Sequence, residues 1–365
     1  MELHEMLRKM VIGKASDLFI KVGVPPSLRI DGTINFLDTD EITPQDTAEI
    51  YEIIEDSKKE GFQGRVDVDV AYELPGIGRF RVNIFRQKGT LAFVFRHIQS
   101  HVPKFEDLNL PESILTKMAS ESRGLILVTG TTGSGKSTTL AAMINYINEN
   151  FNKHILTIED PVEFMFKDTK CVIDQREIGI DVSDFKTALK YAVRQSPDVI
   201  FIGEMRDRET MEAALSAAET GHLVMATLHT VNATQTVERI INYFPPHQHK
   251  LIRLQLSLIL KGVISQRLIP RKNESGRVPS VEIMTDTPTV KELLSEGKTA
   301  ELYGVIKDSE YFGCQSFNQS LRKLYQEDFI SLEKALAASD YPDELRMDLK
   351  GIFRSTMATD MNFDY

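Results

Sequence analysis

A phosphate-binding loop occupies residues 130–137, which read GTTGSGKS and complete the pattern G-x-x-x-x-G-K-[ST]. Such a loop wraps its backbone N–H groups around the phosphates of a nucleotide. We expect Lys136 to reach the β- and γ-phosphates and the Ser137 hydroxyl to hold Mg²⁺. The pattern predicts that the chain binds a nucleoside triphosphate through this loop and the residue after it: Gly130, Thr131, Thr132, Gly133, Ser134, Gly135, Lys136, Ser137 and Thr138.

The sequence on both sides of the loop is what such a loop requires. Residues 125–128 (LILV) form a short apolar run that predicts a buried parallel strand. Residues 138–150 (TTLAAMINYINEN) carry apolar positions at helical spacing. A strand, a glycine loop and a helix N-terminus in this order form a phosphate-binding unit.

Three further apolar runs end in polar residues, where an open α/β sheet places its ligand site. Residues 157–163 (TIEDPVE) carry the carboxylates Glu159, Asp160 and Glu163. Residues 198–207 (DVIFIGEMRD) resemble a Walker B segment, in which Glu204 would lie beside Mg²⁺ or the attacking water. The alternatives are a solvated acidic loop and a strand-end acid without a role.

The third run, residues 221–230 (GHLVMATLHT), has His222 and His229 on either side of a buried strand. Isolated histidines are usually structural. Two of them around one strand in a nucleotide-binding domain favour a functional role.

The first 98 residues predict a smaller mixed α+β domain. The expected elements are strands at 17–22, 27–30 and 66–70, a helix from Thr43 and Pro44 to about Lys59, and a hairpin of 79–85 with 91–98. In the hairpin Arg79 and Arg81 share the polar face, and Arg96 follows on the partner strand. A guanidinium suits the charge that develops in phosphoryl transfer. Alternatively, the arginines solvate an exposed sheet face.

Residues 99–110 suit a short linker, and residues 111–365 alternate helices and buried strands, as in an α/β domain. From Gln248 onward we expect mostly helix, including the strongly apolar stretch 251–264.

Composition limits the classes of function. Lysine and arginine number 43 against 53 acidic residues, a net charge of −10, which argues against a nucleic-acid partner. No apolar run approaches the ~18 residues of a membrane span, and no secretion signal is apparent, so we expect a cytoplasmic protein. Cys171 and Cys314 are too few for a four-ligand zinc site and predict two reduced thiols.

The four polar segments, in this order, resemble the Walker A, Asp box, Walker B and His box of the secretion ATPase superfamily of RecA-like hexameric motors. ASDLFIKVGVPPSLRIDG, GIGRFRVNIF, TGSGKSTTLAAM, IEDPVEF, GEMRDRET and AAETGHLVMATLHT are similar to the type IV pilus retraction ATPases, the PilT/PilU family. The four-cysteine zinc site typical of pilus assembly ATPases is missing from the sequence, which favours the retraction side.

This resemblance implies a RecA-like P-loop ATPase domain, a PAS-like N-terminal domain and a helical C-terminal region. It implies that Glu163 orients or activates the attacking water and that Glu204 completes the acidic side. His229 would sense loss of the γ-phosphate, with His222 a weaker candidate, and at least one of the arginines would act as an arginine finger. The Mg²⁺ ligands would come from Ser137, Glu159, Asp160 and Glu204.

The resemblance also implies ATP as the nucleotide, a homo-hexamer, and a pilus platform protein as partner at the cytoplasmic face of the inner membrane. Residues 288–298 (PTVKELLSEGK) replace the AIRNLIRE-like segment of PilT proteins, and residues 331–351 are similar to PilU. We therefore favour an accessory, PilU-like ATPase that works with a PilT-like retraction ATPase. The alternatives are an autonomous PilT-like motor and a nucleotide-dependent module that supports a PilT ring.

Overall fold

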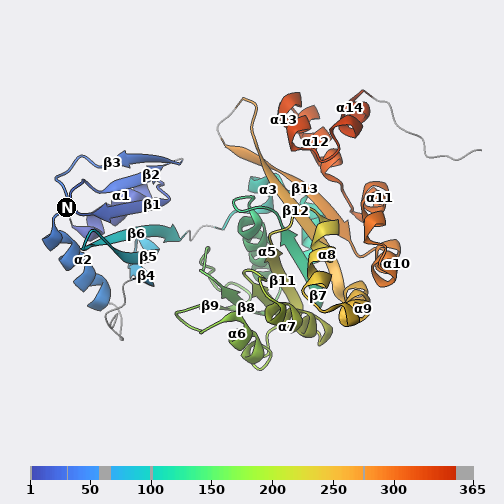
Figure 1. Ribbon diagram of the computed structural model, residues 1–365, viewed down its shortest axis with the longest axis horizontal. Coiled ribbons are helices and arrows are strands. Elements are labelled where there is room, and N and C mark those ends of the chain that lie inside the picture. Colours follow the sequence, from blue (N-terminus) through green and yellow to red (C-terminus); the bar gives the residue numbers. More distant parts are fainter. Residues whose placement is uncertain (1, 31, 57–66, 99–101, 274–275, 351–365) are drawn as a thin grey trace, which may run out of the picture. The chain divides into compact units, whose positions relative to one another are not determined.

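The computed structural model describes residues 2–30, 32–56, 67–98, 102–273 and 276–350, which form two compact units (Figure 1). The first unit comprises Met1–Val102, Pro161–Lys167 and Arg176–Ser183. The second comprises Pro103–Asp160, Asp168–Gln175 and Asp184–Tyr365. Within the described ranges, no helix has the length and apolar character that crossing a membrane requires.

The first unit is built on a six-stranded sheet in the order β3-β2-β1-β6-β5-β4. Its elements are α1 (Leu3–Ile12), β1 (Asp17–Lys21), β2 (Ser27–Ile30), β3 (Thr33–Phe36), α2 (Pro44–Asp56), β4 (Val68–Leu74), β5 (Gly78–Gln87) and β6 (Thr90–Ile98). The paired strands run antiparallel. Helix α1 packs its apolar face into the core through Leu3, Met6, Leu7 and Met10, which follow helical spacing.

The expected hairpin is confirmed as β5 and β6. Phe80, Val82 and Ile84 of β5 are all buried, while the residues between them face the polar side. The alternation of apolar and polar residues therefore identified both the strand and its buried face. The expected helix begins at Pro44, as its cap pattern indicates, and its expected end at Lys59 lies outside the described residues.

The second unit contains the remaining elements, apart from the end of β9. The helices are α3 (Phe105–Leu108), α4 (Glu112–Ala119), α5 (Lys136–Asn150), α6 (Phe185–Ala192), α7 (Arg208–Glu219), α8 (Ala233–Asn242), α9 (His249–Ile259), α10 (Pro288–Glu296), α11 (Leu302–Asp308), α12 (Phe317–Gln326), α13 (Leu332–Ala338) and α14 (Pro342–Leu349). Short 3₁₀ turns lie at Pro246–Gln248, Thr299–Glu301 and Glu310–Phe312. The strands are β7 (Gly124–Thr129), β8 (His154–Glu159), β9 (Val172–Glu177), β10 (Val199–Ile202), β11 (Leu223–Leu228), β12 (Leu260–Pro270) and β13 (Arg277–Thr285).

These strands form a seven-stranded sheet in the order β13-β12-β7-β11-β10-β8-β9. Neighbouring strands from β12 to β8 are parallel, whereas β13 is antiparallel to β12. All residues of β7, β10 and β11 are buried, which explains their continuous apolar runs. Because the strands are parallel, the segments that follow β7, β11, β10 and β8 emerge at one edge of the sheet.

The expectation of mostly helix from Gln248 onward is wrong for residues 260–270 and 277–285, which are strands and include the end of the apolar stretch 251–264. Helix α9 ends at Ile259, and β12 begins at Leu260 and joins the sheet between β7 and β13. A continuously apolar stretch shows no period that separates a buried helix from a strand buried on both faces, so the change at Leu260 was not readable from the pattern.

The C-terminal helices pack against the antiparallel pair formed by β12 and β13. Figure 1 shows α12, α13 and α14 grouped together beside β12 and β13. Ile269 and Val278 of the two strands share a small core with Leu321, Leu324 and Leu345 of the helices. The predicted helical C-terminal region is thus present from α10 onward.

Helix α3 lies inside residues 99–110, the range expected to be a linker, and it belongs to the second unit. Residues 99–101 lie outside the described residues. The domain boundaries 1–98, 99–110 and 111–365 stay predictions.

Candidate functional site

The phosphate loop leaves the buried end of β7 and closes on the first turn of α5. Gly130 and Gly135 have φ values of +146° and +91°, a backbone region that side chains disfavour. A Cβ on Gly130 would collide with Ser134 Oγ and the carbonyl oxygen of Gln266. The glycines therefore serve both the conformation and the close packing of the loop.

The loop surrounds Lys136, whose side chain is 8% exposed. Its Nζ donates to the carbonyl oxygens of Gly130 and Thr131, each at 3.0 Å. Ser134 Oγ is buried and has no hydrogen-bond partner within the described part of the chain. An ammonium, an unsatisfied hydroxyl and a ring of backbone groups fit a phosphate group.

A second cluster forms after the neighbouring strands β10 and β11. Glu204 follows β10 and His229 follows β11, and Glu204 Oε1 lies 3.0 Å from His229 Nε2. The other oxygen, Oε2, lies 2.7 Å from Arg206 Nη2. Burial alone would raise the pKa of Glu204, but Arg206 and His229 outweigh it, so the pKa of this carboxyl is lowered. Glu204 is therefore ionised at neutral pH and held between two basic groups.

The end of β8 adds two carboxylates to the same edge of the sheet. Glu159 is 5% exposed and accepts a 2.7 Å hydrogen bond from Thr157 Oγ1 and a 3.3 Å bond from Gln175 Nε2. Asp160 is exposed and lies 4.0 Å from Arg206. Arg206 therefore lies between Glu204 and Asp160, and His229 joins this cluster through Glu204.

The side chains at the carboxyl ends of these strands suit Mg²⁺ bound together with a nucleotide. In the described ranges, no group of three or more His, Cys, Asp or Glu side chains is arranged to hold a metal ion. Mg²⁺ at nucleotide sites is bound by one or two side-chain oxygens together with phosphates and water. The half-buried Ser137 at the start of α5 and the strand-end carboxylates fit that mode of binding.

His222 does not join this cluster. It precedes β11, at the end of the strand opposite to His229, and its Nδ1 lies 2.9 Å from the carbonyl oxygen of Ala217. Its own carbonyl accepts from Gly124 N at the start of β7. His222 and His229 flank the six-residue strand β11 and therefore lie roughly 20 Å apart. The two histidines cannot share one site.

The three arginines lie in the first unit, each beside a carboxylate. Arg81 donates to both oxygens of Asp69 at 3.2 and 3.3 Å, and Arg96 Nε donates to Asp17 Oδ1 at 3.0 Å. Arg81 and Arg96 are cross-strand partners and line a cavity of about 260 Å³. The polar face expected from the sequence is present, and the arginine-finger role stays a prediction.

Arg79 has a different partner in the same unit. Its Nη2 lies 4.0 Å from Oε2 of Glu177, which is 4% exposed and also accepts from Val162 N. Burial raises the pKa of Glu177.

Glu163 lies beside Val162 with its side chain exposed, so its role in activating water stays a prediction. Glu177 ends β9 within the segment QRE (175–177), and the sequence alone assigned it no functional role.

Gln266 of β12 was also missed, although it touches the phosphate loop. Residues 263–267 (VISQR) show the same change from apolar to polar as the other strand ends. The apolar stretch before it is equally typical of a buried helix, so the sequence alone does not identify this strand end.

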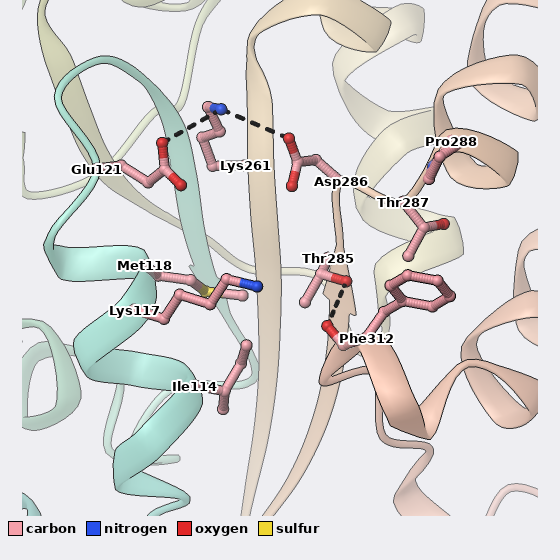
Figure 2. Close-up of a pocket in the computed structure, with 10 residues that line it drawn as sticks. All are labelled: Ile114, Lys117, Met118, Glu121, Lys261, Thr285, Asp286, Thr287, Pro288 and Phe312. Carbon is pink, nitrogen blue, oxygen red and sulfur yellow. Dashed lines mark hydrogen bonds and ion pairs between the residues drawn. The ribbon is translucent and has the colours of Figure 1, made fainter.

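A separate pocket of about 110 Å³ lies at the start of α10. Figure 2 shows Lys261 between Glu121 and Asp286, at 3.2 and 3.5 Å, and the Thr285 hydroxyl directed at the carbonyl oxygen of Phe312. Asp286 also lies 2.9 Å from Lys291 of α10. This network fixes the start of α10.

Comparison with known proteins decides the family. A family model described as type II/IV secretion system protein matches residues 62–324. The type IV pilus ATPase PilU of Pseudomonas aeruginosa is 42% identical over 351 residues, which are 96% of this chain and 92% of that protein. The chain belongs to the PilT/PilU family of type IV pilus ATPases. The resemblance drawn from the motifs is confirmed.

Within the PilT/PilU family the two branches are equally similar to this member. The retraction ATPase PilT of P. aeruginosa is also 42% identical, over 94% of this chain and 99% of that protein. A crystal structure of the pilus retraction motor PilT with bound ADP superimposes with a TM-score of 0.88 at 43% identity, covering 95% of this chain and 99% of that one. The predicted RecA-like α/β fold and ATPase class are confirmed.

Proposed function

We propose that this chain is an ATP-hydrolysing motor of type IV pilus retraction, in the accessory role of PilU. The observation that supports it most is the similarity to both PilU and PilT over more than nine-tenths of the chain, together with a complete phosphate loop. The 3.0 Å contact between Glu204 and His229, after strands that neighbour the phosphate loop, supports the proposed hydrolysis.

In the proposed mechanism, Lys136 binds the β- and γ-phosphates and the loop N–H groups hold the remaining oxygens. Mg²⁺, held by Ser137 with Glu204, Glu159 or Asp160 nearby, would neutralise charge on the phosphates when bound. Glu163 would orient the attacking water, and Arg81 or Arg96 would meet the charge that develops on the γ-phosphate.

His229 is the proposed sensor of hydrolysis. It follows β11, the direct neighbour of β7, and its Nε2 already bonds Glu204. A side chain that contacts both the acidic cluster and the γ-phosphate would be released when that phosphate leaves. Such a change can move a loop or domain by removing a small number of contacts.

Assembly into a homo-hexamer is proposed on the family resemblance, with a PilT-like ATPase and a pilus platform protein as partners at the cytoplasmic face of the inner membrane. The PilU-like role rests on residues 288–298 and 331–351, two ranges that contain α10, α13 and α14. A nucleic-acid translocase is disfavoured because the net charge is −10.

The test is steady-state ATP hydrolysis by the purified protein, alone and mixed with the PilT-like ATPase of the same genome. Lys136→Ala protein serves as the blank because it lacks the phosphate-binding ammonium. Turnover that is weak alone and rises on mixing supports the PilU-like role. Strong turnover alone supports an autonomous PilT-like motor, and no turnover in either setting would support a module that only stabilises a PilT ring.

A further inference from the structure

We propose that Gln266 of β12 is a positioning residue that holds the phosphate loop in its nucleotide-binding shape. The inference rests on the nucleotide binding proposed above and adds a residue that none of the four motifs contains. Gln266 is 136 positions beyond Gly130 along the chain, and only the sheet brings the two together.

Strand pairing places Gln266 at the first residue of the loop. β12 runs parallel to β7, with Ser265 opposite Thr129, the last residue of β7. The Thr129 hydroxyl donates to Ser265 Oγ at 2.9 Å in a buried position. Gln266 and Gly130 follow these two residues, and the Gln266 carbonyl oxygen lies 2.5 Å from the position that a Cβ on Gly130 would take.

The side chain of Gln266 reaches the other end of the loop. It is 3% exposed, and its Oε1 accepts a 2.7 Å hydrogen bond from Thr139 Oγ1 in the first turn of α5. Its Nε2 lies 2.8 Å from the position that a Cβ on Gly135 would take. One buried residue therefore contacts the first glycine, the last glycine and the helix that receives the phosphates.

The amide chemistry suits this position. A neutral side chain anchors the loop without adding charge beside the phosphates, and its hydrogen bond with Thr139 does not use the loop N–H groups that bind them. A carboxylate of the same shape would place a buried negative charge next to the bound anion. A loop shaped before binding loses less conformational entropy when the nucleotide arrives.

The test compares nucleotide affinity and turnover in matched variants of the full chain. Gln266→Leu and Thr139→Val each remove one side of the hydrogen bond, and Thr139→Ser keeps the hydroxyl. The probe is a fluorescent ADP analogue for Kd, with KM and kcat for ATP measured in parallel. Thr285→Val is the control, because it removes a similarly buried hydroxyl bond from the pocket in Figure 2.

We expect about a tenfold rise in Kd and KM for Gln266→Leu and for Thr139→Val, the equivalent of one lost buried hydrogen bond. The double variant should be no weaker than either single one, because both remove the same bond. Thr139→Ser and Thr285→Val should stay within about twofold of the wild type. Gln266→Glu should bind more weakly than Gln266→Leu because of charge repulsion.

Wild-type values of Kd and KM in both Thr139→Val and Gln266→Leu, with only thermal stability lowered, would overturn the inference. If the Gln266 variants do not fold, the Thr139→Val and Thr139→Ser pair decides by itself. A wild-type protein that binds no nucleotide would overturn the proposed function as well. Tight binding by the wild type with unchanged variants overturns this inference alone.

Discussion

Glu282 of β13 gives a prediction about pH whose size follows from the structure. The residue is 3% exposed, and its Oε1 accepts a 2.8 Å hydrogen bond from Ala233 N at the start of α8. Burial raises the pKa of Glu282 to about 7, and the charges of Asp340 and Arg267 act in opposite directions on it. Its ordinary pKa is 4.5, so the native protein holds this proton more tightly than the unfolded chain does.

The sign follows from this difference. Glu282 contributes stability that is fully present below pH 4.5 and is lost as the pH rises through about 7. The gap between the two pKa values corresponds to about 3 kcal/mol, most of which disappears between about pH 5 and about pH 8. Glu282→Gln removes the titration and keeps an oxygen for Ala233 N.

The assay is urea unfolding near pH 5 and near pH 8. Unfolding is monitored by circular dichroism because the chain has no tryptophan for fluorescence. We expect the free energy of unfolding of the wild type to fall by about 2–3 kcal/mol more than that of Glu282→Gln over this range. Comparing slopes with pH, rather than absolute stabilities, cancels any fixed cost of burying the amide.

Glu292→Gln, the same change at an exposed position of α10, is the control and should follow the wild type. Parallel curves for the wild type and Glu282→Gln would refute the reasoning, because they would mean that the native and unfolded states hold the Glu282 proton equally.

The remaining predictions concern turnover, measured with saturating ATP. Glu204→Gln should keep nucleotide affinity and lose at least about a hundredfold in kcat, because one charge of the acidic cluster is removed; near-normal turnover would exclude the role. His229→Ala should lower kcat and leave Glu204 paired with Arg206 alone, and an unchanged rate would end the sensor hypothesis. Arg81→Ala or Arg96→Ala should reduce kcat by about a thousandfold if that residue is an arginine finger, whereas wild-type rates in both would leave them as partners of Asp69 and Asp17.

Much of the site could be predicted because its parts are local. The phosphate loop needs only a strand, glycines and a helix that follow one another, and β7, the loop and α5 do so. Glu204 and His229 were identified as strand-end residues, and parallel strands bring such residues to one edge. The hairpin of β5 and β6 was equally readable, because alternation along a strand separates its two faces.

Other features depended on neighbours that are distant along the chain. The stretch 251–264 contains the end of a helix and the start of a strand. The strand is β12, which is stabilised by parallel pairing with β7. His222 and His229 have equivalent surroundings in the sequence, yet strand direction sends them to opposite ends of β11.

The sequence by itself determined the phosphate loop, the polar strand ends, the polar hairpin face and the family, because each is carried by contiguous residues with their own periodicity or spacing. Only the tertiary structure decided that Gln266 lies against the loop, that Glu204 bonds His229 and that Glu282 is buried under α8. These contacts depend on the order and register of strands in the sheet. That order is set by the packing of the whole domain, which no single segment encodes.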